Sequence, residues 1–220
     1  MKKLTLLLIV LSLNFLNAVT ITKTDTVNLS TTNYTNSFTI AKFDDNGGQY
    51  VLESIEFKLS GHVEGDIEFE SKDTSSATID TNLSAMIQLK RPDGSLLITT
   101  MPTISKTDNV TAWDGTDDFG GTSGNTYTNV SADSIDSISS TTSADLALFT
   151  GTDDILLPMV ATGTSSGNGA GNLLLSFRTT ASSSLEVIYT YSLPTSSPVP
   201  EPSVIALFAM GLVTAWFIKK

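Results

Sequence analysis

Alternation of apolar and polar residues with a period of two constrains the fold of this chain more than any other feature. It runs through residues 55–60, resumes after Gly61 over 63–70, and returns over 79–89. Successive side chains of a strand point to opposite faces, so this period is typical of half-buried antiparallel strands. The apolar members are Ile55, Phe57, Leu59, Val63, Ile67, Phe69, Ile79, Leu83, Ala85, Ile87 and Leu89.

Later segments extend the pattern. Residues 173–177 and 185–191 predict two more strands, and the Pro and Asp-Gly of 91–94 predict a tight turn. Residues 109–143 are rich in Gly, Ser and Thr and predict long loops with one or two short strands, and 163–171 predicts a flexible hairpin loop. The expected fold is all-β, an antiparallel, jelly-roll-like β-sandwich over residues 19–193.

Composition agrees with this class and excludes several functions. Ser and Thr supply 60 of the 220 residues, whereas charged residues reach 16%. Removing the four lysines at the two ends leaves eight basic against 23 acidic residues, a net charge of −15 over 19–202. Such a surface repels phosphate backbones, so no nucleic-acid partner is expected. The chain has no cysteine, which excludes thiol catalysis and thiolate metal sites.

The first eighteen residues predict a signal peptide. Lys2 and Lys3 precede an apolar core of about ten residues, and Ala18 is a small residue suited to the last position before cleavage by signal peptidase. An uncleaved N-terminal anchor is the alternative, but the apolar stretch is short for spanning a bilayer. We therefore expect an exported protein.

The C-terminal end contains a second apolar segment. Residues 204–218 carry no charge and predict a single transmembrane helix, and Lys219 and Lys220 follow at once. Basic residues favour the cytoplasmic side, so residues 19–202 are expected outside the inner membrane. The prolines of 194–203 predict a stiff, extended spacer that a processing enzyme could reach. An ordinary stalk before a permanent anchor is the alternative.

This tail resembles the PEP-CTERM sorting signal of Gram-negative bacteria that make extracellular polysaccharide. The resemblance rests on Val199, Pro200, Glu201, Pro202 and Ser203, followed by the apolar segment and the terminal lysines. It implies recognition by an exosortase, a membrane cysteine transpeptidase, and removal of the helix. The expected location is then the inner membrane before processing, and the cell surface or extracellular space afterwards.

The body is similar to the choice-of-anchor group of bacterial surface domains, most of all to type E. Residues 38–44, 52–61, 65–70 and 187–191 carry this similarity. In that group, similar bodies bear different C-terminal anchoring signals, PEP-CTERM among them. The resemblance implies no catalytic residues.

Carboxylates and a histidine are the candidates for chemistry. Asp114, Asp117 and Asp118 lie in a glycine-containing loop and offer the hard oxygen ligands that calcium prefers; 44–48 is a shorter version, and turn formation is the alternative for both. His62, the single histidine, is placed at a chain reversal at Gly61, on the surface beside carboxylates. No catalytic motif surrounds it, and no enzymatic activity is expected.

The expected function is that of a non-enzymatic surface or extracellular-matrix protein associated with exopolysaccharide and biofilm. A carbohydrate-binding or calcium-dependent adhesion module is the first alternative. A polysaccharide-modifying enzyme, in which a sandwich brings two carboxylates together, is the second.

Overall fold

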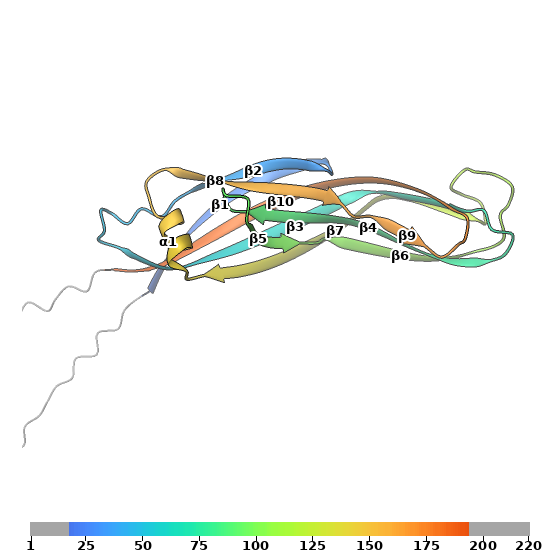
Figure 1. Ribbon diagram of the computed structural model, residues 1–220. Helices are drawn as coiled ribbons and strands as arrows, with labels where there is room; N and C mark the ends of the chain where they lie inside the picture. Colours follow the sequence, from blue (N-terminus) through green and yellow to red (C-terminus); the bar gives the residue numbers. More distant parts are fainter. Residues whose placement is uncertain (1–17, 194–220) are drawn as a thin grey trace, which may run out of the picture.

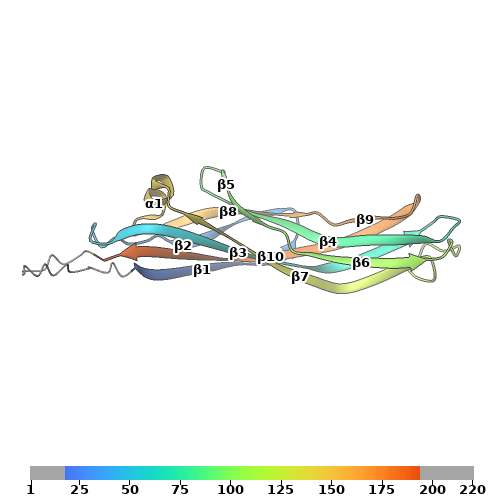
Figure 2. The ribbon, with the colours of Figure 1, turned by 90° about the horizontal axis from the view of Figure 1, so that it is seen from below.

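The computed structural model describes residues 18–193, which form two layers of antiparallel β-sheet stacked into a long, narrow sandwich (Figures 1 and 2). Alternation of side chains builds the longest strand, β3 (Val51–Ser71), in which nearly every second residue is buried. At about 3.3 Å per residue, the 21 residues of β3 extend over roughly 70 Å.

The first layer has the strand order β1-β10-β3-β7 in the described residues. β1 (Ala18–Thr31) and β7 (Gly124–Ser140) are its edges, and β10 (Leu173–Ser192) lies beside β3. Antiparallel pairing of β10 with β3 runs from Leu173 opposite Ser71 to Ser192 opposite Val51. We call this layer the long sheet, because two nearly full-length strands form its centre.

β4 (Ala77–Lys90) is the central strand of the second layer. Its second half pairs with β8 (Asp154–Gly163) and β5 (Leu96–Thr100), and β8 continues the layer to β2 (Tyr34–Ala41). Its first half pairs with β6 (Thr103–Val110) and β9 (Ser166–Asn168). A single strand therefore links the two ends of this layer.

Two clusters of buried apolar side chains, one large and one small, fill the space between the layers. Phe57, Leu59 and Val187 from the long sheet and Ile87 and Leu157 from the other layer are all fully buried. A smaller cluster of Phe69, Ile79 and Val110 continues toward the end of the sandwich where β3 ends. Burial of apolar surface on this scale supplies the main driving force for folding in a chain without disulfides.

The short helix α1 (Ser143–Phe149) follows β7 and covers the core near the end of the sandwich at which β1 begins and β10 ends (Figure 1). Thr142 caps it by accepting a hydrogen bond from the backbone N–H of Asp145 at 3.3 Å. Phe149 is fully buried, and its ring packs edge-on against Phe57 with the centroids 5.1 Å apart. The sequence pattern did not predict this helix.

The prediction of antiparallel half-buried strands is confirmed in its coarse form, and two details are wrong. No reversal occurs at Gly61, because β3 continues through it; 173–177 and 185–191 likewise belong to one strand, β10. At Gly61, an added Cβ would meet the side chains of Thr100 and Ile87. Close packing of the two layers therefore accounts for a glycine at this position.

The prediction of long loops over 109–143 is also wrong. β7 occupies 17 of these residues, and its burial pattern is mostly exposed because it is the edge strand of the long sheet. Ser and Thr at such an edge replace the apolar residues that mark a central strand. The turn at 91–94 is confirmed: Gly94 has a φ of 86°, and its N–H donates to the Arg91 carbonyl at 2.9 Å.

Candidate functional site

The predicted sorting signal and both predicted apolar segments lie outside the described residues, and so does the predicted signal peptide apart from Ala18. The residues of the sorting signal are Val199, Pro200, Glu201, Pro202, Ser203, Lys219 and Lys220. Ala18, the predicted cleavage position, is the first residue of β1 and pairs with Ser192 near the end of β10. The first and the last described residues therefore lie at the same end of the sandwich (Figure 1). Within residues 18–193, no helix is long and apolar enough to cross a membrane.

Three loops meet at the opposite end, and we call this region the distal tip. It consists of 72–76, 111–123 and 169–172. Asp73 joins them: its carboxylate accepts hydrogen bonds from the N–H groups of Gly171 (2.8 Å) and Asn172 (3.0 Å), and its carbonyl accepts one from the N–H of Trp113 (2.8 Å). The tip is thus one connected structure rather than three independent loops.

Asp114 organises the longest of these loops. Its carboxylate accepts from the N–H of Thr116 at 3.1 Å, the hydroxyl of Thr116 at 2.9 Å and the N–H of Thr122 at 3.2 Å. These hydrogen bonds, those from Thr116 first, hold the pKa of Asp114 below its usual value. The carboxylate therefore closes the loop on itself.

The other two acidic residues of the loop point to different partners. The Asp117 carboxylate pairs with the ammonium of Lys72 at 2.8 Å, and the Asp118 carboxylate accepts from the N–H of Gly120 at 3.0 Å. In residues 18–193, no three Asp, Glu, His or Cys side chains gather into a group that could hold a metal ion. The arrangement is that of a turn, and calcium binding at Asp114, Asp117 and Asp118 stays a prediction.

Trp113 is the large exposed side chain of the distal tip. Its residue is 41% exposed, and its indole N–H donates to the Thr116 carbonyl at 3.0 Å. The ammonium of Lys72 lies over the ring, 5.4 Å from its centroid, in a cation–π contact. Lys72 thereby links the ring of Trp113 to the carboxylate of Asp117.

Glu70 is a buried carboxylate next to this loop. The residue is fully buried, and neither carboxylate oxygen has a hydrogen-bond partner among the described residues. It lies opposite Gly124 on β7, where an added Cβ would collide with the carboxylate. An unpaired carboxylate in such a place costs free energy, and glycine at 124 is what leaves room for it.

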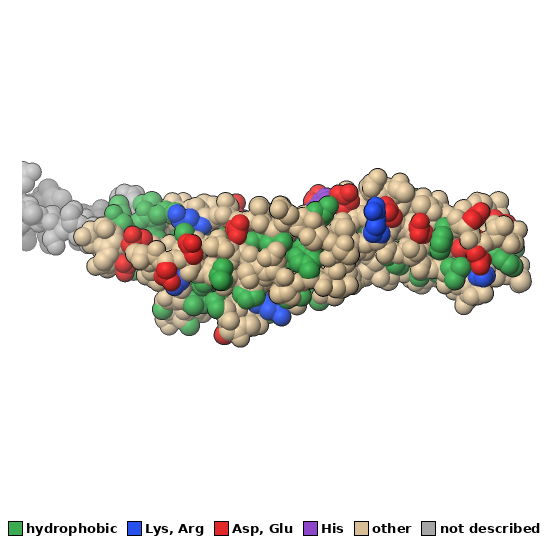
Figure 3. All heavy atoms as spheres, turned by 90° about the horizontal axis from the view of Figure 1, so that it is seen from above, with side chains coloured by type: hydrophobic (Ala, Val, Ile, Leu, Met, Phe, Trp, Pro, Cys, Tyr) green, Lys and Arg blue, Asp and Glu red, His purple; other side chains and the backbone are tan. Residues whose placement is uncertain are grey.

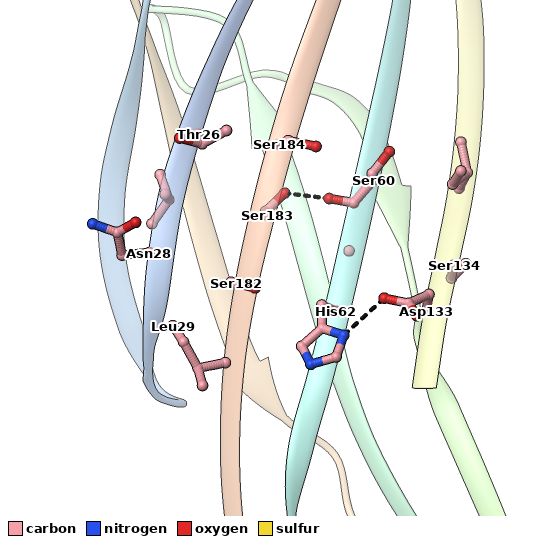
Figure 4. Close-up of a pocket in the computed structure, with 13 residues that line it drawn as sticks. Thr26, Asn28, Leu29, Ser60, His62, Asp133, Ser134, Ser182, Ser183 and Ser184 are labelled. Carbon is pink, nitrogen blue, oxygen red and sulfur yellow. Dashed lines mark hydrogen bonds and ion pairs between the residues drawn. The ribbon is translucent and has the colours of Figure 1, made fainter. Parts of the chain in front are cut away.

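A shallow hollow of about 500 Å³ lies midway along the outer face of the long sheet (Figure 4). His62 on β3 contacts the Asp133 carboxylate through Nδ1 at 2.7 Å, and its Nε2 lies 3.6 Å from the Glu64 carboxylate. Ser60 and Ser182 line the same hollow. Carboxylates flank both ring nitrogens of His62, and among the described residues no serine hydroxyl is hydrogen-bonded to either nitrogen, as a nucleophile beside its base would be.

Charge is spread along the face of the molecule that Figure 3 shows rather than concentrated at one place. Figure 3 shows acidic side chains at intervals along one face, with the histidine next to some of them.

The strongest ion pair by geometry lies near the helix: Arg91 donates from Nε to one oxygen of Asp145 at 2.7 Å and from Nη2 to the other at 2.9 Å. Hydrogen bonds from Arg91, and then from Ser140, lower the pKa of Asp145 to about 2.

Sequence reasoning placed the acidic loop but missed its partners. The contact of Lys72 with Trp113 and Asp117 joins residues about 40 positions apart, and no local pattern encodes it. The exposed tryptophan in a Gly- and Asp-rich segment was the available signal. The contact of Asp133 with His62 does not follow from the sequence either, because the sequence predicts loop over the residues that form β7.

No family model and no curated protein matches the chain. Among solved structures it is similar to chains of infectious bursal disease virus: one of the Gx strain (15% identity, TM-score 0.21, 84% of this chain and 38% of that chain) and one of the VP2 subviral particle (14%, TM-score 0.20, 81% and 37%). This chain spans about two fifths of their length. These TM-scores are too low to support any inference about this protein.

Proposed function

We propose that this chain is an exported, non-enzymatic surface protein that is sorted through its C-terminal tail and displayed with its distal tip pointing away from the membrane. The single observation that supports this most strongly is the antiparallel pairing of β1 with β10. Val19, the first residue of the proposed mature chain, lies opposite Tyr191, so residues 19 and 193 lie at one end of a long sandwich. An anchor in the chain after residue 193 would therefore hold the sandwich by the end at which β1 begins and β10 ends.

The sequence of the tail supplies the rest of the proposal. It resembles a PEP-CTERM signal, with the processing motif at 199–203 and a basic end at Lys219 and Lys220. An exosortase-type transpeptidase is the proposed processing partner, and exopolysaccharide the proposed surroundings. The finer fold assignment, a jelly-roll-like body of the choice-of-anchor type between a signal helix and a transmembrane helix, belongs to the same proposal.

Shape favours display over catalysis. The hollow at His62 is shallow, and the carboxylates of the distal tip bind the loop itself or Lys72. A cleft with two free carboxylates, as glycoside hydrolysis needs, is not formed by these residues. A rod of roughly 70 Å built on strands of up to 21 residues suits a spacer that holds its tip away from a surface.

The test is fractionation of cells that make the wild-type chain or the triple variant Pro200→Ala, Glu201→Ala, Pro202→Ala. We expect the wild type outside the inner membrane and the variant retained in it, because processing needs the motif. Ser196→Ala with Ser197→Ala is the matched control, since it changes the same spacer but not the motif, and it should behave like wild type. An unchanged distribution of the triple variant would contradict sorting at this motif.

A further inference from the structure

The distal tip holds Trp113 exposed on a loop that is otherwise well connected. Its backbone N–H is bound by Asp73, its indole N–H by Thr116, and its ring is contacted by Lys72. The residue nevertheless remains 41% exposed. An ordered and exposed tryptophan points to a binding surface, because tryptophan combines a large apolar surface with few rotatable bonds and is enriched at such surfaces.

Hydrogen bonding fixes the ring before any partner arrives. Asp114 closes the loop through Thr116 and Thr122, and the N–H of Ser71 on β3 donates to the Ser123 carbonyl at 2.9 Å. Ordering of a loop on binding costs free energy, and a loop already ordered avoids most of that cost. The tip therefore presents the ring as a rigid platform.

The surroundings of the ring restrict the partner. Within loop 111–123, Trp113 is the one large apolar side chain that is strongly exposed, and Phe119 is partly buried. A stable protein interface buries about 800 Å² on each partner, with an apolar centre, which one indole does not provide. At the ring, the ammonium of Lys72 is paired with the carboxylate of Asp117 at 2.8 Å, so the carboxylate of Asp118 and the net acidity of the body remain to oppose anionic lipids and phosphates.

A sugar ring matches both features. One face of a hexopyranose consists of C–H groups that can stack on an aromatic ring, while its hydroxyls donate to carboxylate and carbonyl oxygens. Asp118 and the Thr116 hydroxyl lie in the same loop as the platform, and Asp117 is 46% exposed at its side chain although it pairs with Lys72. The acidic loop would repel a uronate but accept hydrogen bonds from a neutral sugar.

We propose that the distal tip binds neutral hexopyranose units of a polysaccharide by stacking on the face of the Trp113 ring that Lys72 does not cover. Glycan contact at this place presupposes the display proposed above, because the tip would otherwise not face an extracellular matrix. Binding itself, however, is a property of the tip and can be measured without sorting.

The experiment uses the full chain in detergent with Trp216→Phe, so that Trp113 is the remaining tryptophan. Soluble gluco-, galacto- and chito-oligosaccharides are titrated while the emission of Trp113 is recorded, and oligogalacturonate serves as the anionic comparison. We expect a saturable change of emission with at least one neutral series and none with oligogalacturonate. Calorimetry on Trp113→Ala in the otherwise wild-type chain should show affinity reduced about tenfold or more.

Two variants separate binding from folding. Leu156→Ala removes another strongly exposed apolar side chain, away from the tip, and should leave affinity unchanged. Trp113→Phe keeps an aromatic ring and should bind between wild type and Trp113→Ala, even if alanine disturbs the loop.

Emission unaffected by every neutral series, equal affinity of Trp113→Ala and wild type, or preference for oligogalacturonate would overturn the glycan site. A chain that binds glycan but stays in the inner membrane would instead refute the display, so the two failures are distinguishable.

Discussion

Ala18 at the start of β1 is the antiparallel neighbour of Ser192 near the end of β10. The two strands are neighbours in the long sheet, so the first and the last described residues lie at the same end of the sandwich. The loop that precedes Val51, opposite Ser192, lies at the same end, whereas the turn after Ser71 lies at the distal tip. If the tail is anchored as proposed, this pairing makes the distal tip point away from the anchor.

Energy transfer can measure that direction, because the chain has no cysteine and accepts single labels. A donor dye at Gln49→Cys would lie at the end near the tail, and one at Ser76→Cys at the distal tip; both positions are exposed. In full-length protein inserted into vesicles that contain a lipid-linked acceptor, we expect strong transfer from position 49 and weak transfer from 76, since roughly 70 Å of β3 separates the two ends.

Equal transfer from both labels would mean that the sandwich lies flat on the bilayer, which contradicts display of the tip. Labelled protein mixed with vesicles after removal of the tail is the control, and should give weak transfer from both positions.

The ion pair of Arg91 and Asp145 should contribute strongly to stability. The Asp145 side chain is 5% exposed, and Arg91→Met would leave its carboxylate with Ser140 as a remaining partner at 2.6 Å. We expect a loss of about 2–3 kcal/mol in the free energy of unfolding, measured by denaturant titration. Lys58→Met is the control: it breaks an exposed pair of 3.6 Å with Glu186 and should cost less than about 1 kcal/mol.

Acid should remove the contribution of Asp145. Its pKa is about 2 in the folded chain and about 3.9 in an unfolded one, so its charge stabilises the fold above about pH 4 and ceases to do so as pH falls toward 2. The stability difference between wild type and Asp145→Asn should therefore shrink between pH 5 and 2. A difference that stays constant or grows over this range would refute the assignment. The exposed Asp154→Asn should change stability little at any pH.

Glu70→Gln should stabilise the protein at neutral pH. A buried carboxylate without a hydrogen-bond partner among the described residues is more costly than a buried amide of the same shape. We expect a gain of about 1 kcal/mol or more in the free energy of unfolding. Glu68→Gln, two residues earlier on the same face of β3 and partly exposed, should have little effect. A loss of stability in Glu70→Gln would show that the charge has a partner.

Period-two alternation was sufficient to predict the centre of the fold. The alternation puts Phe57, Leu59 and Ile87 among the apolar members of half-buried strands, and all three are fully buried. Alternation cannot tell whether a glycine interrupts a strand, which is why Gly61 was misread as a reversal. It also fails at the edge strand β7, where few side chains need to be apolar.

Contacts between distant residues limited the prediction of the site. Asp73 binds loops about 40 and 100 positions away in the sequence, and the ammonium of Lys72 lies over one face of the Trp113 ring. The pairing of the strands, rather than the local sequence, brings these residues together. The sequence indicates the carboxylates of the acidic loop, but which atoms they bind depends on how the loop folds back on itself and on the position of Lys72. The predicted sorting residues lie outside the described residues, so Val199 to Ser203 remain a prediction from sequence.

The intact mass of the protein recovered from the organism that makes it tests the central claim most directly. Sorting through the tail predicts a species that lacks residues 1–18 and everything beyond about Pro202, found outside the inner membrane. A species that keeps Trp216, Lys219 and Lys220 in every fraction would contradict it.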